Sequence, residues 1–258
     1  MKLKHVLTVV TAVAAISSQG FAAKDDGFSA PQKKQVEQVI HDYLVSHPEV
    51  LVEASQVLQQ KQQKELQLQA QNAILEQSTP LFKGQLAVAG DPKGNVTLVE
   101  FFDYQCVHCK KMNPVVQSLT EKNKNLRVVY KEFPIFGKTS EFASQAALAA
   151  AVQGKYKAMQ DALLSQEKPL TDAIVLDAAK SIGLNIDQLK KDMDSQAIKD
   201  ELAANRQLAE KIHLMGTPAF IIASTPKGQF DTKTKPSFVP GGASETSLQD
   251  MINQQAKK

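Results

Sequence analysis

The most informative segment of the chain reads VEFFDYQCVHCK and covers residues 99–110. Its first half is largely apolar and is typical of a buried strand. Its second half holds Cys106 and Cys109, which are separated by two residues and stand where a helix is expected to begin. They are the only two cysteines among the 258 residues. A chain with one such pair has no wider disulfide framework, so the pair needs a chemical explanation of its own.

The position of the pair at a helix start favours redox chemistry. The helix dipole and the free N–H groups of the first turn stabilise a thiolate on Cys106, which we expect to be exposed and to react with substrates. Cys109 lies one turn later, should be more buried, and would resolve the mixed disulfide. His108 can stabilise the thiolate further by hydrogen bonding or charge. A stabilised thiolate favours the reduced form, so the disulfide becomes a stronger oxidant.

Three other interpretations of the pair are weaker. A zinc site needs more ligands, and the remaining candidates His41, His47 and His213 are scattered along the chain. Haem attachment needs a histidine directly after the second cysteine, where Lys110 stands. A structural disulfide would close a loop too small to stabilise the fold much. We therefore expect a redox pair that uses no metal and no cofactor.

The pattern around the pair indicates an α/β fold. Apolar runs predict strands, apolar residues at helical spacing predict helices, and glycine and proline mark the turns. The expected order is a strand at 95–102, a helix to about 122, a strand at 126–133, a helical block at about 140–211, strands at 219–223 and 237–239, and a helix at 244–255. This order places helices over a sheet. Phe101 and Met215 are expected to pack in the interior.

Two separated motifs together resemble the DsbA family of the thioredoxin superfamily. The first is the segment 99–110, and the second is GTPAF at residues 216–220. The likeness extends over about residues 85–255 and includes the helical block after the second strand. It implies a thioredoxin-like fold with an inserted helical subdomain at about 140–211, contained in a domain that covers residues 80–258.

The resemblance also implies roles for individual residues, and it makes Cys106, Cys109, His108 and Glu100 the catalytic group. Glu100 matches the superfamily's buried acid, which transfers a proton to or from the second cysteine. A glutamate at a strand end that faces water is the alternative.

Two further residues match the substrate-binding part of the family. Pro218 corresponds to the family's cis-proline, which lies against the cysteine pair. Thr217 would present its backbone to a substrate peptide, which binds as an added strand. On the strand after Glu100, Lys131 is a candidate charge partner for that acid.

The first residues are expected to be a secretory signal peptide, residues 1–22. Lys2 and Lys4 form a basic start, an apolar run covers residues 6–16, and small residues precede a cleavage site after Ala22. A retained membrane anchor is the alternative, but the run is shorter than the ~20 residues that span a bilayer. We expect the mature protein in the periplasm. Removing the leader reduces the 30 basic residues to 28, against 27 acidic ones, so charge gives no case for nucleic acid binding.

Residues 23–79 are expected to form an N-terminal helical segment. A first helix should begin near Pro31, and the sequence SHPE at residues 46–49 predicts a capping box that opens a second helix ending near Gln77. One face of the first helix is apolar and consists of Val36, Val39, Ile40, Tyr43 and Leu44. The segment resembles the leader helices of oligomeric DsbA-like and ScsC-like proteins. We expect a homo-oligomer, with a dimer favoured; helices folded back onto their own domain are the alternative.

These observations predict a periplasmic thiol:disulfide oxidoreductase that forms, and can also isomerise, disulfide bonds in exported proteins. Val107 stands where the family's strong oxidants have proline, and Thr217 before the proline resembles isomerases and reductases. The expected partners are cysteine-containing exported proteins and a membrane redox protein of the DsbB or DsbD type. Two alternatives stay open: an exported chaperone-like peptide-binding module with incidental cysteines, and a metal-handling protein such as a copper-resistance partner.

Overall fold

The computed structural model describes residues 27–84 and 86–257, so the expected signal peptide lies outside the described residues. Contacts divide the chain into an N-terminal unit, Met1–Gln59, and a catalytic unit, Gln60–Lys258. The division falls inside helix α2, Glu49–Glu76. Within the described ranges, none of the helices is both long enough and apolar enough to cross a membrane.

The N-terminal unit contains helix α1, Ala30–Ser46, and the first part of α2. The start of α1 is capped because the backbone N–H of Ser29 donates to Oε1 of Gln32 at 2.8 Å. Pro31 occupies the first turn, where its missing N–H costs no hydrogen bond. The helix contributes no residue to the core of the described chain, and most of its expected apolar face is exposed.

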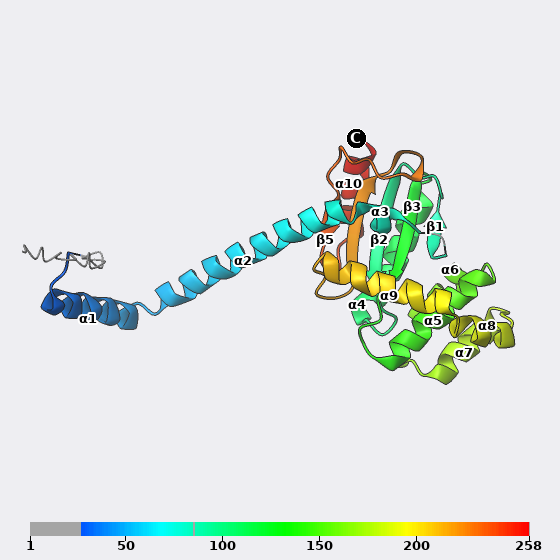
Figure 1. The fold of residues 1–258 in the computed structure, drawn as a ribbon, viewed down its shortest axis with the longest axis horizontal. Coiled ribbons are helices and arrows are strands. Elements are labelled where there is room, and N and C mark those ends of the chain that lie inside the picture. The colour runs from blue at the N-terminus through cyan, green and yellow to red at the C-terminus, as the bar shows by residue number, and fades with distance from the viewer. Residues whose placement is uncertain (1–26, 85, 258) are drawn as a thin grey trace, which may run out of the picture. The chain divides into compact units, whose positions relative to one another are not determined.

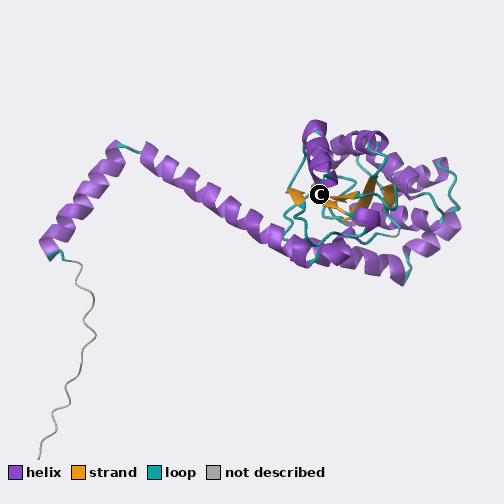
Figure 2. Cartoon of the chain, turned by 90° about the horizontal axis from the view of Figure 1, so that it is seen from above, coloured by secondary structure: helices purple, strands orange, loops and turns teal. Residues whose placement is uncertain are grey.

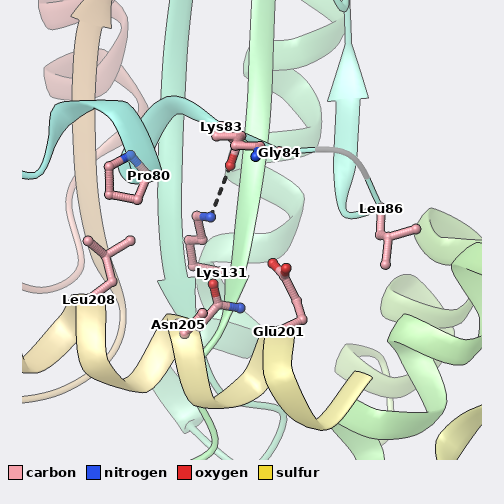
Figure 3. A pocket seen from close by; sticks show the side chains of 9 residues that line it. Pro80, Lys83, Gly84, Leu86, Lys131, Glu201, Asn205 and Leu208 are labelled. Carbon is pink, nitrogen blue, oxygen red and sulfur yellow. Dashed lines mark hydrogen bonds between the residues drawn. The ribbon is translucent and has the colours of Figure 1, made fainter. Parts of the chain in front are cut away.

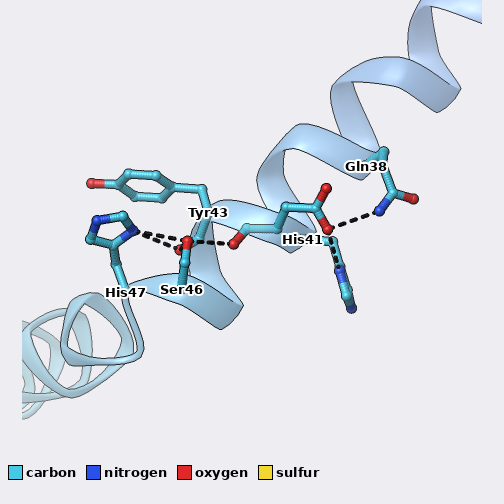
Figure 4. A network of polar contacts seen from close by, with 6 residues as sticks. Gln38, His41, Tyr43, Ser46 and His47 are labelled. Atoms are coloured by element: carbon cyan, nitrogen blue, oxygen red, sulfur yellow. Dashed lines mark hydrogen bonds and ion pairs between the residues drawn. The ribbon is translucent and has the colours of Figure 1, made fainter.

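The end of α1 differs from the expectation for residues 46–49. Ser46 is the last residue of α1, and its hydroxyl donates to the carbonyl oxygens of Asp42 at 2.6 Å and Tyr43 at 3.1 Å (Figure 4). The Tyr43 carbonyl also accepts from the backbone N–H of His47 at 2.8 Å, so the Ser46 hydroxyl adds a second hydrogen bond to the last turn, as serine commonly does within a helix. The prediction that Ser46 caps α2 is therefore wrong. The ring of Tyr43 stacks on His47 with 4.5 Å between centroids, after which α2 begins at Glu49.

The catalytic unit contains a five-stranded mixed sheet in the order β1-β3-β2-β4-β5. The strands are β1 Val88–Gly90, β2 Val96–Phe102, β3 Leu126–Glu132, β4 Ala219–Ser224 and β5 Ser237–Val239. β2 and β3 are parallel, and the other pairs are antiparallel. Every residue of β2, β3 and β4 is buried, which explains why most of their residues are apolar.

Helices cover both faces of this sheet (Figure 2). They are α3 Ser78–Phe82, α4 Val107–Lys122, α5 Lys138–Val152, α6 Tyr156–Leu164, α7 Asp172–Ser181, α8 Ile186–Met193, α9 Gln196–Lys211 and α10 Glu245–Ala256. Alternate residues of β2 serve the two faces. Leu98 and Phe102 belong to the core with α4, α10 and most of the insertion, whereas Val99 and Phe101 pack with α3 and the end of α9. The thioredoxin-like fold with a helical insertion between β3 and β4 is confirmed (Figure 1).

The C-terminal part of α2 belongs to the catalytic unit. Its small and branched residues Ala70 and Ile74 are buried, and Ile74 packs with Leu81 and Phe82 of α3. Ile74 is among the largest fully buried side chains of the described protein. Burying a side chain of this size contributes about 2 kcal/mol, which holds this part of the helix against the sheet.

Candidate active site

The two sequence motifs meet at the first turn of α4. Cys106 is the N-cap residue of this helix, and its sulfur accepts a hydrogen bond from the backbone N–H of Cys109 at 3.3 Å. The Cys106 thiol in turn donates to the carbonyl oxygen of Thr217 at 3.3 Å. The Thr217–Pro218 peptide bond is cis, as the family resemblance implied. The geometry therefore brings the cysteine pair against the segment before β4, 111 residues further along the chain.

Both cysteines are present as thiols and differ in acidity. Hydrogen bonding from Cys109 is the main reason that the pKa of Cys106 falls from 9.0 to about 6; burial opposes this, and Thr217 and backbone N–H groups add to it. Burial and the same hydrogen bond raise the pKa of Cys109 well above its ordinary value. A thiolate at neutral pH therefore forms on Cys106, while Cys109 holds its proton.

The Cys106 thiol is more buried than the sequence indicated. Cys106 is 3% exposed, so the expectation of an exposed thiol is wrong. Thr217 lies directly against it, a contact that only the family resemblance had implied.

The side chain of His108 is exposed, and it is the backbone N–H of this residue that helps to lower the pKa of Cys106. The participation of its imidazole in stabilising the thiolate stays a prediction. Val107, the preceding residue, is 63% exposed and presents an apolar side chain next to the pair.

Glu100 is buried on β2, on the same face as α4. Burial raises its pKa from 4.5 to about 8; Lys157 lowers it, and the charge on Cys106 raises it further. The alternative of a glutamate that faces water is therefore wrong. The acid is protonated at neutral pH, and its ionisation is coupled to that of the cysteine pair.

Lys131 is not the charge partner of Glu100. In the register of β2 and β3, Glu100 lies opposite Tyr130, and Lys131 lies opposite Phe101 on the other face of the sheet. There the Lys131 ammonium donates to the carbonyl oxygen of Lys83 at 3.0 Å, beside a cavity of about 290 Å³ (Figure 3). Burial is the main cause of its lowered pKa.

A second buried acid, Glu132, was missed by the sequence analysis. Its Oε1 accepts hydrogen bonds from the hydroxyls of Tyr104 at 2.7 Å and Tyr156 at 2.8 Å. Burial raises its pKa from 4.5 to about 8, and these phenols oppose the shift. The sequence could have identified Glu132, because a carboxyl group on a fully buried strand is costly unless it has partners.

Asp103 fixes the loop that carries Cys106, and the sequence analysis did not identify it. Its fully buried carboxylate accepts hydrogen bonds from the backbone N–H of Gln105 at 2.7 Å and from the Ser140 hydroxyl at 2.7 Å. The backbone N–H groups of Ile135 and Phe136 donate to the other oxygen at 2.7 and 3.1 Å. This one side chain joins the turn before Cys106 to the start of the helical insertion.

Two family models match the chain. The DSBA-like thioredoxin domain matches residues 97–253, and the copper resistance protein ScsC N-terminal domain matches residues 32–65. The first covers the whole cysteine site and most of the sheet, and the second covers parts of α1 and α2. The expected likeness to DsbA-like and ScsC-like proteins is confirmed.

Solved structures show the same likeness. BcfH from Salmonella enterica Typhimurium is 31% identical with a TM-score of 0.73, over 88% of this chain and 96% of that one. A thioredoxin-like oxidoreductase from Silicibacter pomeroyi is 37% identical with a TM-score of 0.62, over 69% of this chain and 96% of that one.

Among curated relatives, the Na(+)/H(+) antiporter NhaA 3 of Salinispora tropica is 27% identical over 157 residues, 60% of this chain. The match spans about a quarter (24%) of that relative's length.

Proposed function

The chain belongs to the family of DSBA-like thioredoxin domains, and we propose that it forms and isomerises disulfide bonds in exported proteins. The observation that carries this proposal is the difference in acidity between two cysteines that lie within one helical turn. Cys106 is acidic and contacts Thr217, whereas Cys109 is buried and retains its proton. Such a pair has one sulfur to exchange with a substrate and one to close the cycle.

In the oxidising direction, a substrate thiolate attacks the sulfur of Cys106 and breaks the Cys106–Cys109 bond. The electron pair of that bond goes to Cys109, which then takes up a proton. A second substrate thiolate attacks the substrate sulfur of the mixed disulfide and releases Cys106 as a thiolate. The substrate loses two electrons and gains a disulfide, and the enzyme gains two electrons as a dithiol.

Isomerisation begins from the reduced enzyme. The Cys106 thiolate attacks an incorrect substrate disulfide and forms a mixed disulfide, which a different substrate thiol then resolves. No net electrons are transferred, because Cys106 leaves as the thiolate with which it began.

Glu100 is the proposed proton carrier for Cys109 in these steps. It is protonated at neutral pH, it is buried on the face of the sheet that α4 covers, and its ionisation responds to the charge on Cys106. A group with a pKa of about 8 can both give and accept a proton near neutral pH.

The processing, location and redox partner of the enzyme are also proposals. We propose cleavage after Ala22, a periplasmic location, and exchange with a membrane redox protein of the DsbB or DsbD type. The N-terminal helical segment, residues 23–79, would hold copies of the chain together as a homo-oligomer, with a dimer favoured. The exposed apolar face of α1 supports this, because α1 buries no residue against the rest of the described chain.

The reduction potential of the pair, measured by equilibration with glutathione buffers, tests the proposal. A potential of about −120 mV would indicate a disulfide donor, and about −180 mV would fit an isomerase. A pair that resists reduction below about −300 mV would be a structural disulfide and would refute the proposal. In parallel, Cys109→Ser should accumulate a mixed disulfide between Cys106 and a glutathionylated cysteine peptide. The Cys106 thiolate displaces glutathione from the peptide sulfur, and the product persists because the resolving thiol is gone.

The match to a copper resistance protein's N-terminal domain favours a second candidate, a role in copper tolerance. Within residues 27–84 and 86–257, no group of three or more His, Cys, Asp or Glu side chains could hold a metal ion. The reduced Cys106 and Cys109 sulfurs would then be the ligands, since thiolates prefer Cu(I). Titration of the reduced protein with Cu(I) tests this: tight one-to-one binding that is lost in Cys106→Ser supports it, and weak binding removes it.

A further inference from the structure

A groove of about 560 Å³ begins at the active centre and extends away from it along the catalytic unit. One end is formed by Thr217 and Pro218, and the Thr217 carbonyl is the group that contacts the Cys106 thiol. From there the groove continues past Met215 and Phe238. A substrate cysteine bound to Cys106 would therefore have its neighbouring residues at the mouth of this groove.

The opposite wall of the groove is the C-terminal part of α2. Gln63, Leu66, Gln67 and Ala70 line it, and their spacing places them on one face of the helix. The wall runs from Gln63 to Ala70, which at the rise of an α-helix is roughly 10 Å and equals about three residues of extended peptide. The buried Ala70 and Ile74 anchor the helix here, so the wall is fixed within the catalytic unit.

The groove surface is mostly apolar, and His213 is the one ionisable side chain among the described residues that line it. Met215 is 96% exposed and Leu66 is 57% exposed, so both leave apolar surface in water. The expectation that Met215 packs in the interior is wrong, because its segment is held away from the core at the mouth of the groove. Among the described residues that line the groove, none is Asp, Glu, Lys or Arg. The amides of Gln63 and Gln67 offer donors and acceptors that suit a peptide backbone.

We infer that α2 forms part of the substrate-binding surface, and that Leu66 and Met215 select apolar residues next to the substrate cysteine. The occupant is an extended segment of an unfolded polypeptide, about three residues long. Continuity with the Cys106–Thr217 contact argues for this occupant, because a chain held at Cys106 must pass along the segment before β4. A flexible methionine adapts to different apolar side chains, as a general disulfide enzyme requires. The inference deepens the proposed function and rests on it.

Three glutamine substitutions on the full-length protein test the inference, at Leu66, Met215 and the control position Leu68. Leu66→Gln removes the apolar side chain from the wall, and Leu68→Gln is the matched control. Leu68 is 52% exposed on the same helix but does not line the groove. Leucine and glutamine have similar helix propensity, so neither change should disturb α2.

The measured quantity is the rate at which the reduced protein forms a mixed disulfide with two glutathionylated cysteine peptides. The peptides have equal length and charge; one carries apolar residues beside cysteine, and the other carries serine and asparagine. Wild type should prefer the apolar peptide, and Leu66→Gln should lower this preference by about 5-fold, from the loss of partial leucine burial. Leu68→Gln should keep the wild-type preference, and Met215→Gln should lower it as Leu66→Gln does.

Three outcomes would overturn the inference. The first is a wild type without preference between the peptides, and the second is an equal loss of preference in Leu66→Gln and Leu68→Gln. The third is a fall in the sedimentation mass of Leu66→Gln with the peptide preference intact, which would make the groove a contact between copies. Reduction of oxidised glutathione, which has no long flanking chain, separates these from a failure of the proposed function: only that failure would abolish glutathione exchange in wild type.

Discussion

The N-terminal unit and the catalytic unit bury their apolar residues to very different extents. The strands β2, β3 and β4 are buried at every position, while α1 carries exposed Val39 and Ile40 and buries no residue in the described chain. The catalytic unit therefore contains the interactions that stabilise it. Capping and helix propensity contribute to the stability of α1, and the proposed contact between copies of the chain would add to it.

The largest effect should come from Cys106→Ser, which removes the nucleophile of the catalytic unit. Exchange with disulfide peptides should be abolished, because serine forms no disulfide. The oligomeric mass should stay unchanged, because the proposed contacts between copies lie in the other unit. Peptide reduction assays and analytical ultracentrifugation measure the two properties. Peptide exchange that persisted would refute Cys106 as the reacting group, and a changed mass would break the separation of the two units.

Ile40→Lys on α1 is expected to have the opposite effect: the oligomeric mass should fall, and the exchange activity should remain. Ile40 lies on the expected apolar face and is 53% exposed, so a charge there should dissociate the proposed oligomer without unfolding the catalytic unit. Exchange with glutathione should continue at the wild-type rate per active site.

Val45→Lys is the control for this change. Val45 is 68% exposed on the same helix, about half a turn away from the face that contains Ile40. The sedimentation mass of Val45→Lys should match that of wild type. Dissociation by both variants alike would indicate a general loss of helix and would contradict a specific apolar contact.

A smaller effect, which depends on pH, is expected for Glu100→Gln. The folded-state pKa of about 8 is above the ordinary 4.5, so the contribution of Glu100 to stability is full below about pH 4.5 and is lost as the pH rises to 8. Wild type should thus lose on the order of 1 kcal/mol per pH unit relative to Glu100→Gln over this range. Urea unfolding at pH 5 and pH 8 measures the difference. The exposed Glu53 of the N-terminal unit supplies the control Glu53→Gln, and an equal pH effect in both variants would refute burial as its cause.

The smallest effect should follow from Gln32→Ala, which removes the acceptor for the Ser29 N–H at the start of α1. The expected cost is about 1 kcal/mol of local helix stability. Hydrogen exchange of the α1 amides should report it, with Gln35→Ala on the same helix as the control. Protection in the catalytic unit should not change, and a loss there would show that the two units stabilise each other.

The sequence predicted four of the five strands, and those in the middle of the sheet were recognisable because their buried residues are mostly apolar. It missed β1, which has three residues, none of them fully buried. It predicted the meeting of Cys106 and Thr217 only through the family resemblance. The prediction that Lys131 pairs with Glu100 was wrong, because it depended on the register of β2 and β3. A shift of one residue along β3 moves a side chain to the opposite face, and the amino-acid sequence does not reveal the register. Glu132 could have been found by the argument that was applied to Glu100.

Features that depend on contacts between distant segments could not be predicted. The burial of Cys106 depends on a segment more than a hundred residues away, with a sequence separation of 111. The Ser46 hydroxyl donates to carbonyls of the helix that it ends, and its motif alone could not distinguish the two helices. The exposure of Met215 follows from its place at the groove, which forms only when the C-terminal part of α2 packs with the rest of the catalytic unit.

The tyrosine cluster around Glu132 also has a spectroscopic consequence. The chain has no tryptophan and four tyrosines, of which Tyr104, Tyr130 and Tyr156 are buried in the catalytic unit and Tyr43 is exposed in the N-terminal unit. Near-ultraviolet circular dichroism requires aromatic rings in fixed surroundings. The tyrosine band of this protein should therefore report the melting of the catalytic unit almost alone, while the far-ultraviolet helix band reports both units. Unfolding followed at the two wavelengths would separate the two units optically without any added label.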